Sequence, residues 1–233
     1  GSLPQETMKL NPIRHYFDAL LGALGPSGWW PGETPFEVSV GAILTQNTNW
    51  GNVEKAIAAL KSARALTPSA MRSLAVEELA ELIRPAGYFR VKATRLGNFL
   101  DFLASEAGGD EAALDDPGLA NLRRQELPRL REKLLAVRGI GPETADSILL
   151  YALDKPSFVV DAYTARLMQR HGLAPEVTDY HELQDIFTSA LPEDVDLYNE
   201  YHALIVRVGK EFCKKSKPRC GECPLGSFLE SAA

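Results

Sequence analysis

The sequence contains no apolar run that approaches the length of about 20 residues needed to span a bilayer. Residues 1–7 precede Met8 and lack the basic start, apolar middle and small-residue cleavage site of a secretory signal. Cysteine is scarce, and three cysteines without a signal do not indicate a disulfide framework. These absences predict a protein without membrane contact that works in a reducing, cytoplasmic compartment.

Positive charge is in the minority, with 25 Lys and Arg against 31 Asp and Glu. The net charge of −6 argues at first against nucleic acid, whose phosphates are bound by basic residues. The two signs are segregated, however: acid gathers at 106–116 and 193–200, and base at 84–95, 123–138 and 210–219. This distribution permits a basic face opposite an acidic one, so charge neither supports nor excludes a nucleic-acid partner.

Strand signals are almost absent. The one strand-like run, 157–160, is short, follows Pro156 and has no neighbouring strand to pair with. Helical spacing dominates instead, as in the apolar positions of 13–24 and 96–103. Proline and glycine interrupt the chain often enough for roughly ten helices of ordinary length, and 104–119 is predicted to be a loop or linker. The fold class is therefore predicted to be all-α.

The most informative segment is Leu134–Leu150, in which two helical patterns meet at Gly139-Ile140-Gly141. Glycines one residue apart permit a tight reversal and allow a phosphate close to the backbone, while Ile140 is expected to point inward. Pro142 suits the first position of the second helix, whose N–H groups and positive dipole end then form a phosphate site that ignores base sequence. On the glycine pair alone, an ordinary helical hairpin is the better interpretation.

The flanking residues change that interpretation. Val137–Asp146, followed by Phe158–Leu167, resembles the helix-hairpin-helix and catalytic aspartate signature of the endonuclease III superfamily of DNA glycosylases. The resemblance extends to Gly41–Thr48, to Gly87–Ala93 and to the cysteine tail, so it covers nearly the whole chain. The two signature segments together are far more specific than the glycine pair.

Three short features narrow the resemblance to one branch. Trp29-Trp30-Pro31, Leu44–Thr48 and Glu143 together are most similar to the 3-methyladenine DNA glycosylase III branch. The resemblance implies a monomer that binds double-stranded DNA containing a damaged base, in the cytoplasm and at the nucleoid of a bacterium or archaeon. It also implies two helical domains with DNA in the cleft between them: a six-helix barrel over 35–154 that contains the hairpin 134–150, and a second domain, formed by 8–34 and 155–233, with the catalytic aspartate and the cysteine loop.

Asp161 opens a helical pattern after an apolar run, so on local grounds it is a helix N-cap. By resemblance it is also the catalytic carboxylate, which stabilises the positive charge that develops on the sugar or orients the attacking water.

The nucleotide must first leave the duplex, and the resemblance assigns Gln46 to fill the gap and Tyr88 to wedge between the opposing bases. A polar loop residue and a packed core aromatic are the alternatives for these two positions. The residues that the resemblance assigns to the DNA backbone are Gly139, Ile140, Gly141, Glu143 and Thr144.

Bifunctional members of the superfamily carry a lysine in the second hairpin helix, which forms a Schiff base with the sugar and then cleaves the strand. This chain has Glu143 at that position, and a carboxylate cannot form an imine. The sequence therefore predicts a monofunctional glycosylase without AP-lyase activity. Lys133, Lys155 or Lys210 could substitute from elsewhere, although no local feature favours any of them.

The three tryptophans, Trp29, Trp30 and Trp50, flank the Gln46 loop. A 3-methyladenine base is cationic and leaves readily, so its enzyme mainly needs an aromatic slot that attracts the ring by stacking and cation–π contact. By resemblance, Trp29 and Trp50 sandwich the base. The alternative is that these tryptophans are buried as core packing.

All three cysteines fall in Cys213-x6-Cys220-x2-Cys223. This spacing matches the first three ligands of the superfamily's 4Fe-4S cluster loop, but Leu229 takes the fourth position and cannot bind iron. Three interpretations stay open: a cluster with three cysteines and another ligand, a different metal site such as zinc with an outside histidine, or a loop of free thiols. The surroundings favour the first, because thiols between lysines and a proline have little reason to pack as a core.

Two other functions would use some of the same residues. A mismatch uracil or thymine glycosylase, or an oxidised-pyrimidine glycosylase of the endonuclease III kind, would combine Asp161 and the hairpin with a different base pocket. A non-catalytic helix-hairpin-helix module would use the hairpin alone, and the presence of Asp161 argues against it.

Overall fold

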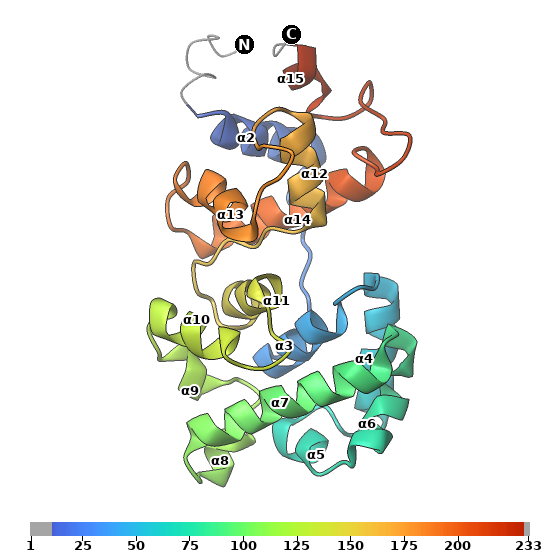
Figure 1. The fold of residues 1–233 in the computed structure, drawn as a ribbon, viewed down its shortest axis with the longest axis vertical. Helices are drawn as coiled ribbons and strands as arrows, with labels where there is room; N and C mark the ends of the chain where they lie inside the picture. The colour runs from blue at the N-terminus through green and yellow to red at the C-terminus, as the bar shows by residue number, and fades with distance from the viewer. Residues whose placement is uncertain (1–10, 231–233) are drawn as a thin grey trace. The chain divides into compact units, whose positions relative to one another are not determined.

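The computed structural model describes residues 11–230, and the regular structure within them is entirely helical (Figure 1). This confirms the all-α prediction, and the run 157–160 is extended chain without a paired strand. The described part holds 14 α-helices rather than roughly ten, because several are short turns that proline and glycine signals do not resolve. These short helices are α5 (Pro68–Arg72), α8 (Glu111–Leu114), α9 (Ala120–Arg123) and α15 (Gly226–Glu230). Met8, the predicted start of the second domain, lies outside the described residues.

The described chain divides into two compact units. The central unit is Trp30–Ser157, and the terminal unit combines the described residues up to Trp29 with those from Phe158 onward. Besides α5, α8 and α9, the central unit contains α3 (Pro35–Leu44), α4 (Trp50–Ser62), α6 (Val76–Leu82), the 3-10 turn η1 (Arg84–Ala86), α7 (Phe89–Ala107), α10 (Leu127–Leu135), α11 (Pro142–Ser147) and the π-helical stretch η2 (Ile148–Ala152). Besides α15, the terminal unit contains α2 (Pro12–Leu24), α12 (Ala162–Arg170), α13 (Tyr180–Thr188) and α14 (Val195–Glu211). Among residues 11–230, no helix combines the length and the apolar character required to cross a bilayer.

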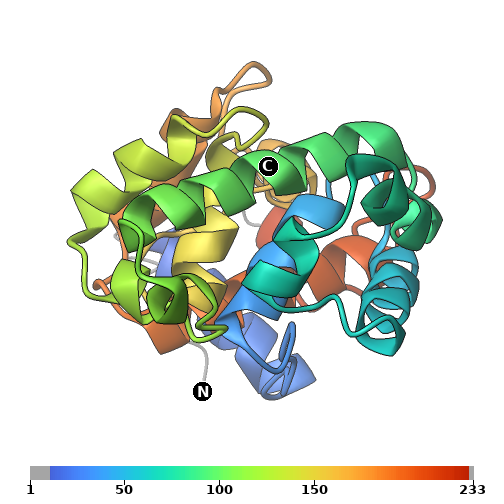
Figure 2. The same ribbon diagram turned by 90° about the horizontal axis from the view of Figure 1, so that it is seen from below.

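The core of the central unit forms around α3 and α7. Phe36, Val40 and Ile43 of α3 are completely buried, because this apolar helix packs against α4, α7 and η2. α7 is amphipathic and runs across the unit (Figure 2), with Leu96 and Phe99 buried on its inner face. Burial of each such side chain contributes roughly 1.5–3 kcal/mol. α7 packs against α3, α5, α6, α8 and α9, so it is one of the two helices around which this unit is built.

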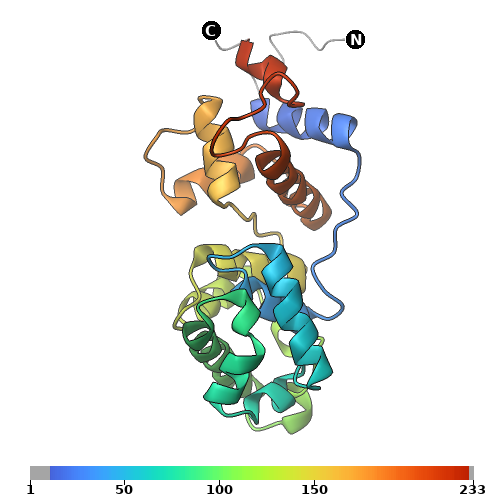
Figure 3. The same ribbon diagram turned by 90° about the vertical axis from the view of Figure 1, so that its right-hand side faces the viewer.

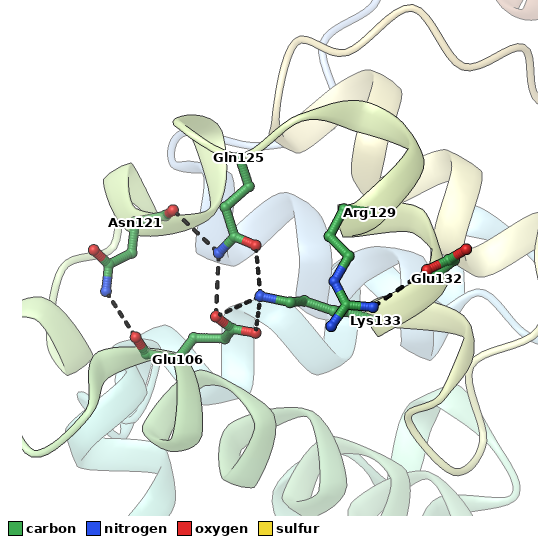
Figure 4. A network of polar contacts seen from close by, with 6 residues as sticks. All are labelled: Glu106, Asn121, Gln125, Arg129, Glu132 and Lys133. Atoms are coloured by element: carbon green, nitrogen blue, oxygen red, sulfur yellow. Dashed lines mark hydrogen bonds and ion pairs between the residues drawn. The ribbon is translucent and has the colours of Figure 1, made fainter.

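The segment 104–119 is only in part the loop that its sequence predicts, because 104–107 and 111–114 are helical. α7 continues into it and ends only where Gly108 adopts a left-handed φ of 60°, and α8 follows within the same segment. Polar contacts fasten the end of α7 to α9 and α10 (Figure 4). Lys133 of α10 pairs with Glu106 of α7 at 3.0 Å and donates to the side chain of Gln125 at 2.9 Å. The segment is thus part of the folded unit.

The hairpin consists of α10, α11 and η2. Gly139 has a φ of 93°, whereas Gly141 has a φ of −89° that any residue adopts, so only the first glycine needs its conformational freedom. The proline that follows takes the first helical position, and Ile140 is buried, as predicted. Arg131 of α10 donates twice to the buried carboxylate of Asp146 on α11, at 2.8 and 3.0 Å. This bidentate pair joins the two helices behind the turn.

The terminal unit packs around α14, which contacts α12 and α2 (Figure 3). Aromatic rings fill its core: Phe158 stacks on Phe187 with ring centroids 4.5 Å apart, and Tyr201 meets both rings edge-on. The strand-like run is therefore apolar because it lies in this core and not because it pairs in a sheet. The buried hydroxyl of Tyr201 donates to the carbonyl of Ile13 at 2.7 Å and so connects α14 to α2.

A methyl group at the hairpin turn should destabilise the protein strongly at only one of its two glycines. At Gly139, alanine combines a positive φ with a Cβ that would collide with Cγ of Arg95, so we expect a loss of roughly 2–4 kcal/mol in the free energy of unfolding. At Gly141, the matched control, no atom lies within 4 Å of an added Cβ, and the loss should stay below about 1 kcal/mol. Urea unfolding of both variants measures the difference, and equal losses would contradict this account.

Candidate functional site

The turn of the hairpin presents backbone N–H groups at the start of α11. Gly141 caps this helix without a side chain, and because Pro142 has no N–H, the first helical donors belong to Glu143 and Thr144. The side chain of Glu143 is exposed, whereas Thr144 is buried. A helix start of this kind attracts anions through its N–H groups and its dipole. The turn thus presents backbone donors of the kind that the predicted phosphate site requires.

Gln46 lies against this hairpin. Its Nε2 donates to the Gly139 carbonyl at 3.1 Å and to the Thr144 hydroxyl at 2.9 Å, and its Oε1 accepts from Nη1 of Arg95 at 2.5 Å. Two segments that the sequence separates by more than 90 residues therefore share one hydrogen-bond network. Arg95 of α7 was not among the predicted site residues, because nothing in its local sequence distinguishes it from an ordinary surface arginine.

Tyr88 is an exposed aromatic residue, with 68% of its surface accessible, so the core alternative is wrong for this position. It caps α7 in a left-handed conformation with a φ of 46°, which a residue with a Cβ adopts only at some cost in energy. Gly87, directly before it, also has a positive φ of 71°. These two residues project the ring from the start of a long, well-packed helix.

Asp161 is the N-cap of α12, as its sequence context predicts. Its Oδ1 accepts hydrogen bonds from the Thr164 N–H at 2.9 Å and the Thr164 hydroxyl at 3.0 Å, and its Oδ2 lies 2.9 Å from Nε2 of His202. Burial pushes the pKa of Asp161 up, but the hydrogen bond and charge of His202 and the two Thr164 bonds outweigh burial and hold the pKa below its ordinary value. The carboxylate is therefore ionised at neutral pH.

His202 carries no signal in the sequence that marks it as part of this site. It lies on α14, 41 positions after Asp161, and reaches the carboxylate only because α14 packs against α12. The exposed fraction of each side chain is only 12%. An imidazole beside a carboxylate orients it and offsets part of the free energy lost when the charge leaves water.

The hairpin and the ionised N-cap aspartate fall within one family pattern. The sequence model of the HhH-GPD superfamily of base excision DNA repair proteins matches residues 40–193, a range that includes both features. The chain belongs to this superfamily. It is accordingly a DNA glycosylase of base excision repair.

Similar proteins agree with this assignment. A protein of Methanocaldococcus jannaschii provisionally named a DNA repair glycosylase is 46% identical over 223 residues, which are 96% of this chain and 98% of that protein. Endonuclease III of Thermotoga maritima is 30% identical over 196 residues, which are 84% of this chain and 83% of that protein. The structure of H. pylori 3-methyladenine DNA glycosylase bound to 1,N6-ethenoadenine matches with a TM-score of 0.70 at 30% identity, over 84% of this chain and 96% of that one.

Two of the three tryptophans of this glycosylase lie at the surface. Trp30 is 61% exposed and Trp29 is 40% exposed, so the core alternative is wrong for both. Trp50, the first residue of α4, is partly buried, and its ring lies 3.4 Å from the position that a Cβ on Gly41 would take. Trp29 belongs to the terminal unit, and the other two belong to the central unit. Their role in a base pocket stays a prediction.

The three cysteines line one small cavity in the terminal unit, together with Leu229 and His171. Cys213 is buried, Cys223 is partly buried and Cys220 is exposed, and all three are free thiols. Burial raises the pKa of Cys223, and the two neighbouring thiols add to this effect. The chain thus gathers its cysteines as the family spacing predicts.

Two arginines of α12 hold the loop that carries these cysteines. Nε of Arg166 donates to the Cys213 carbonyl at 2.7 Å. The guanidinium of Arg170 donates to the carbonyls of Lys214 at 2.7 Å and Lys215 at 3.1 Å, and it lies 3.4 Å from the Cys213 sulfur. The backbone of the loop is therefore fastened to α12 by hydrogen bonds from the protein itself.

The residues present do not fit the complete cluster site of the family pattern. A 4Fe-4S cluster held by the protein uses four ligands, and Leu229 brings an apolar side chain to the fourth position. Within residues 11–230, no three or more Cys, His, Asp or Glu side chains are placed to hold one metal ion. His171, which the sequence spacing does not bring near, lines the cavity, but its Nδ1 forms a 2.7 Å hydrogen bond with the Tyr16 hydroxyl. The donor set is one ligand short, so we assign no chemical role to a cluster.

Restoring the missing position should change the metal content. We expect Leu229→Cys, reconstituted with iron and sulfide, to hold markedly more of both per chain than the unsubstituted protein, because it supplies four thiolates at the family spacing. Leu229→Ser is the matched control, similar in size but without a thiolate, and should gain none. A full complement of iron in the unsubstituted protein would contradict the account of a missing ligand, and its loss in His171→Ala would identify the histidine as that ligand.

Proposed function

We propose that this protein is a monofunctional DNA glycosylase that removes alkylated purines such as 3-methyladenine from double-stranded DNA and leaves an abasic site. The observation that carries the proposal is the ionised Asp161 carboxylate at the start of α12, held by His202, in a chain of the HhH-GPD superfamily. The preference for purines is supported by the identity to a 3-methyladenine DNA glycosylase whose structure holds a modified adenine.

In this proposal Asp161 acts on the sugar and not on the base. As the N-glycosidic bond breaks, its electron pair leaves with the base and positive charge develops on the deoxyribose, which a fixed carboxylate stabilises. Both oxygens of Asp161 already accept hydrogen bonds in the free protein, so the charge does not have to be reoriented during the reaction. A cationic 3-methyladenine departs as a neutral base without a general acid. Water then adds to the sugar and loses a proton, which leaves the abasic site.

The central unit grips and opens the duplex in this proposal. The backbone at 139–144 binds phosphate without reading sequence, which suits an enzyme that must find damage in any context. Tyr88 is already exposed and wedges between the bases, whereas Gln46 must exchange its hydrogen bonds with Arg95 and the hairpin before it can fill the gap. The protein acts as a monomer on this substrate.

The proposed base pocket is aromatic. Trp29, Trp30 and Trp50 are its candidates, and the first two have exposed surface that a base can contact. A cationic purine gains about 0.5–2 kcal/mol from each aromatic face that it meets. A neutral oxidised pyrimidine gains much less from the same faces, so the positive charge of the lesion becomes the basis of selection.

A second candidate activity is the release of oxidised pyrimidines. It is favoured by the 30% identity to the endonuclease III of Thermotoga maritima. The same Asp161 and hairpin would serve that reaction, and only the base pocket would differ. The two candidate activities are therefore distinguished by the base that the protein releases. The same measurement distinguishes both from a glycosylase that removes uracil or thymine from a mismatch.

Base release from duplex oligonucleotides tests the proposal. We expect the protein to release 3-methyladenine faster than uracil or thymine glycol, and Asp161→Asn to lower that rate at least about 100-fold, because the amide lacks the charge that stabilises the transition state. Asp179→Asn is the matched control, since Asp179 caps α13 through the same side-chain bond to the third helical N–H. Faster release of an oxidised pyrimidine would refute the purine preference, and an active Asp161→Asn would refute the catalytic role.

Two of the three lysines that could substitute for the missing lyase nucleophile have their amino groups engaged in other contacts. Lys133 is held by Glu106 and Gln125 (Figure 4), and Lys155 donates to the Arg123 carbonyl at 2.8 Å. Lys210 is an exposed residue near the end of α14. A Schiff-base lysine has to reach the sugar with a free amino group, and the amino groups of Lys133 and Lys155 are already engaged in these contacts.

The product strand should therefore stay intact until it is treated with heat or alkali. Borohydride reduction should trap no covalent complex with the unsubstituted protein, because Glu143 cannot form an imine. Glu143→Lys should yield a trapped complex, and Glu143→Gln, its matched control, should not. Trapping by the unsubstituted protein that disappears when one lysine is replaced would show lyase activity and contradict the proposal.

A further inference from the structure

Lys92 of α7 is a buried lysine, with 1% of its surface exposed. Its ammonium group donates to the carbonyl oxygens of Leu44 at 2.8 Å and Ala86 at 2.9 Å. Burial, and then the charge of Arg95, lower the pKa of Lys92, so its surroundings disfavour the charged form. A methionine of similar length would pack here without that penalty. Packing alone therefore does not account for a lysine at this position.

The two acceptors end two different elements. Leu44 is the last residue of α3 and Ala86 is the last residue of η1. Carbonyls at a helix end lack helical partners and carry the negative end of the dipole, so they are favourable acceptors for a cation. Gln46 follows Leu44 by two residues, and Tyr88 follows Ala86 by two. One ammonium group thus joins the chain directly before both residues that we propose to enter the duplex.

Further contacts tie the same residues to α7. The N–H of Lys92 donates to the Tyr88 carbonyl at 2.9 Å, in the first turn of the helix. Arg95, one turn further, donates to the Gln46 side chain and fills the space beside Gly139. Tyr88, the Gln46 loop and the hairpin turn are therefore all held in place by contacts with one helix, α7. Among the residues of α7 that make these contacts, Lys92 is buried inside the protein.

We propose that Lys92 is a positioning residue for base extrusion: it fixes the Gln46 loop and Tyr88 at one separation, so that both side chains enter the duplex at the same lesion. This proposal rests on the extrusion roles that the proposed function gives to Gln46 and Tyr88. Lys92 is enclosed by protein and acts on DNA only through those two residues.

Lys92→Met tests the proposal, because it keeps the length of the side chain and removes both hydrogen bonds. The measurements are base release from duplex and from single-stranded oligonucleotides carrying 3-methyladenine, and the fluorescence of 2-aminopurine beside the lesion as a signal of extrusion. We expect duplex release and the extrusion rate to fall about 10- to 100-fold. Release from the single strand should change less than about threefold, because no duplex has to be opened.

A merely structural lysine would lower the two rates in equal proportion, as the folded fraction falls, and that result would overturn the proposal. Lys92→Arg, which can still donate to both carbonyls, should keep duplex release within about threefold of the unsubstituted protein. Lys133→Met is the matched control, because it removes a partly buried lysine of the same unit whose contacts lie away from both loops. Its ratio of duplex to single-strand release should not change. Should Lys92→Met lose its fold, Lys92→Gln, which reaches at most one carbonyl, supplies the same ratio.

Combination with Gln46→Ala and Tyr88→Ala separates the two levels of the inference. If Lys92 acts through these residues, adding Lys92→Met to the double variant Gln46→Ala, Tyr88→Ala should lower duplex base release by less than about threefold further. A further full loss of about 10-fold or more would overturn the positioning role while leaving the extrusion roles intact. Unchanged duplex release in Gln46→Ala and Tyr88→Ala would refute the extrusion roles themselves, and the positioning role with them.

Discussion

The crossing of α12 and α14 sets the geometry of the terminal unit. At the crossing, Gly209 leaves space for the Tyr163 ring, which would collide with a Cβ, so the two helices approach closely. Arg166 of α12 reinforces the contact by donating to the Gly209 carbonyl at 3.1 Å. Only at this separation does His202 come within 2.9 Å of Asp161. The proposed catalytic carboxylate is thus held by a tertiary contact between helices as well as by its own cap, and its ionised state depends on both.

Each unit contains a charged side chain that is largely removed from water, a carboxylate in the terminal unit and a lysine in the central unit. Asp161 is a buried anion, and it is satisfied by an N–H, a hydroxyl and an imidazole. Lys92 is a buried cation, and it is satisfied by two helix-end carbonyls. A charge removed from water destabilises the fold unless its partners are already in place, so each ion requires a particular arrangement of the elements around it. The packing of the helices and the positions of the proposed site residues therefore depend on each other in this protein.

The chain departs from the pattern of its superfamily at two positions that carry chemistry. Glu143 stands where bifunctional members have a lysine, and Leu229 stands at the fourth position of the cysteine loop. The fold tolerates both changes for local reasons. The side chain of Glu143 is exposed beside the hairpin turn, and the cysteine loop is fastened to α12 by Arg166 and Arg170. Chemistry can thus vary at these positions while the helical framework persists.

Features that depend on neighbouring residues could be predicted from the amino-acid sequence alone. The hairpin turn, the first-position proline and the cap at Asp161 follow from backbone preferences that act over a few residues, and the structure has them where they were expected. The all-α class followed from helical periodicity for the same reason. The number of helices and the structure of 104–119 did not, because short turns are stabilised by contacts such as that of Lys133 with Glu106, which local patterns do not encode.

The contacts between distant side chains, in contrast, come from the packing of the helices. His202 joins Asp161 across 41 residues, Arg95 joins Gln46 across 49 and Lys92 joins Leu44 across 48. Histidine, arginine and lysine on the polar side of a helix look alike in sequence whether they face water or a buried partner. The difference arises from helix packing, since a close approach at a glycine or an apolar face places one polar residue opposite another, and that placement has no signature in the residues beside it.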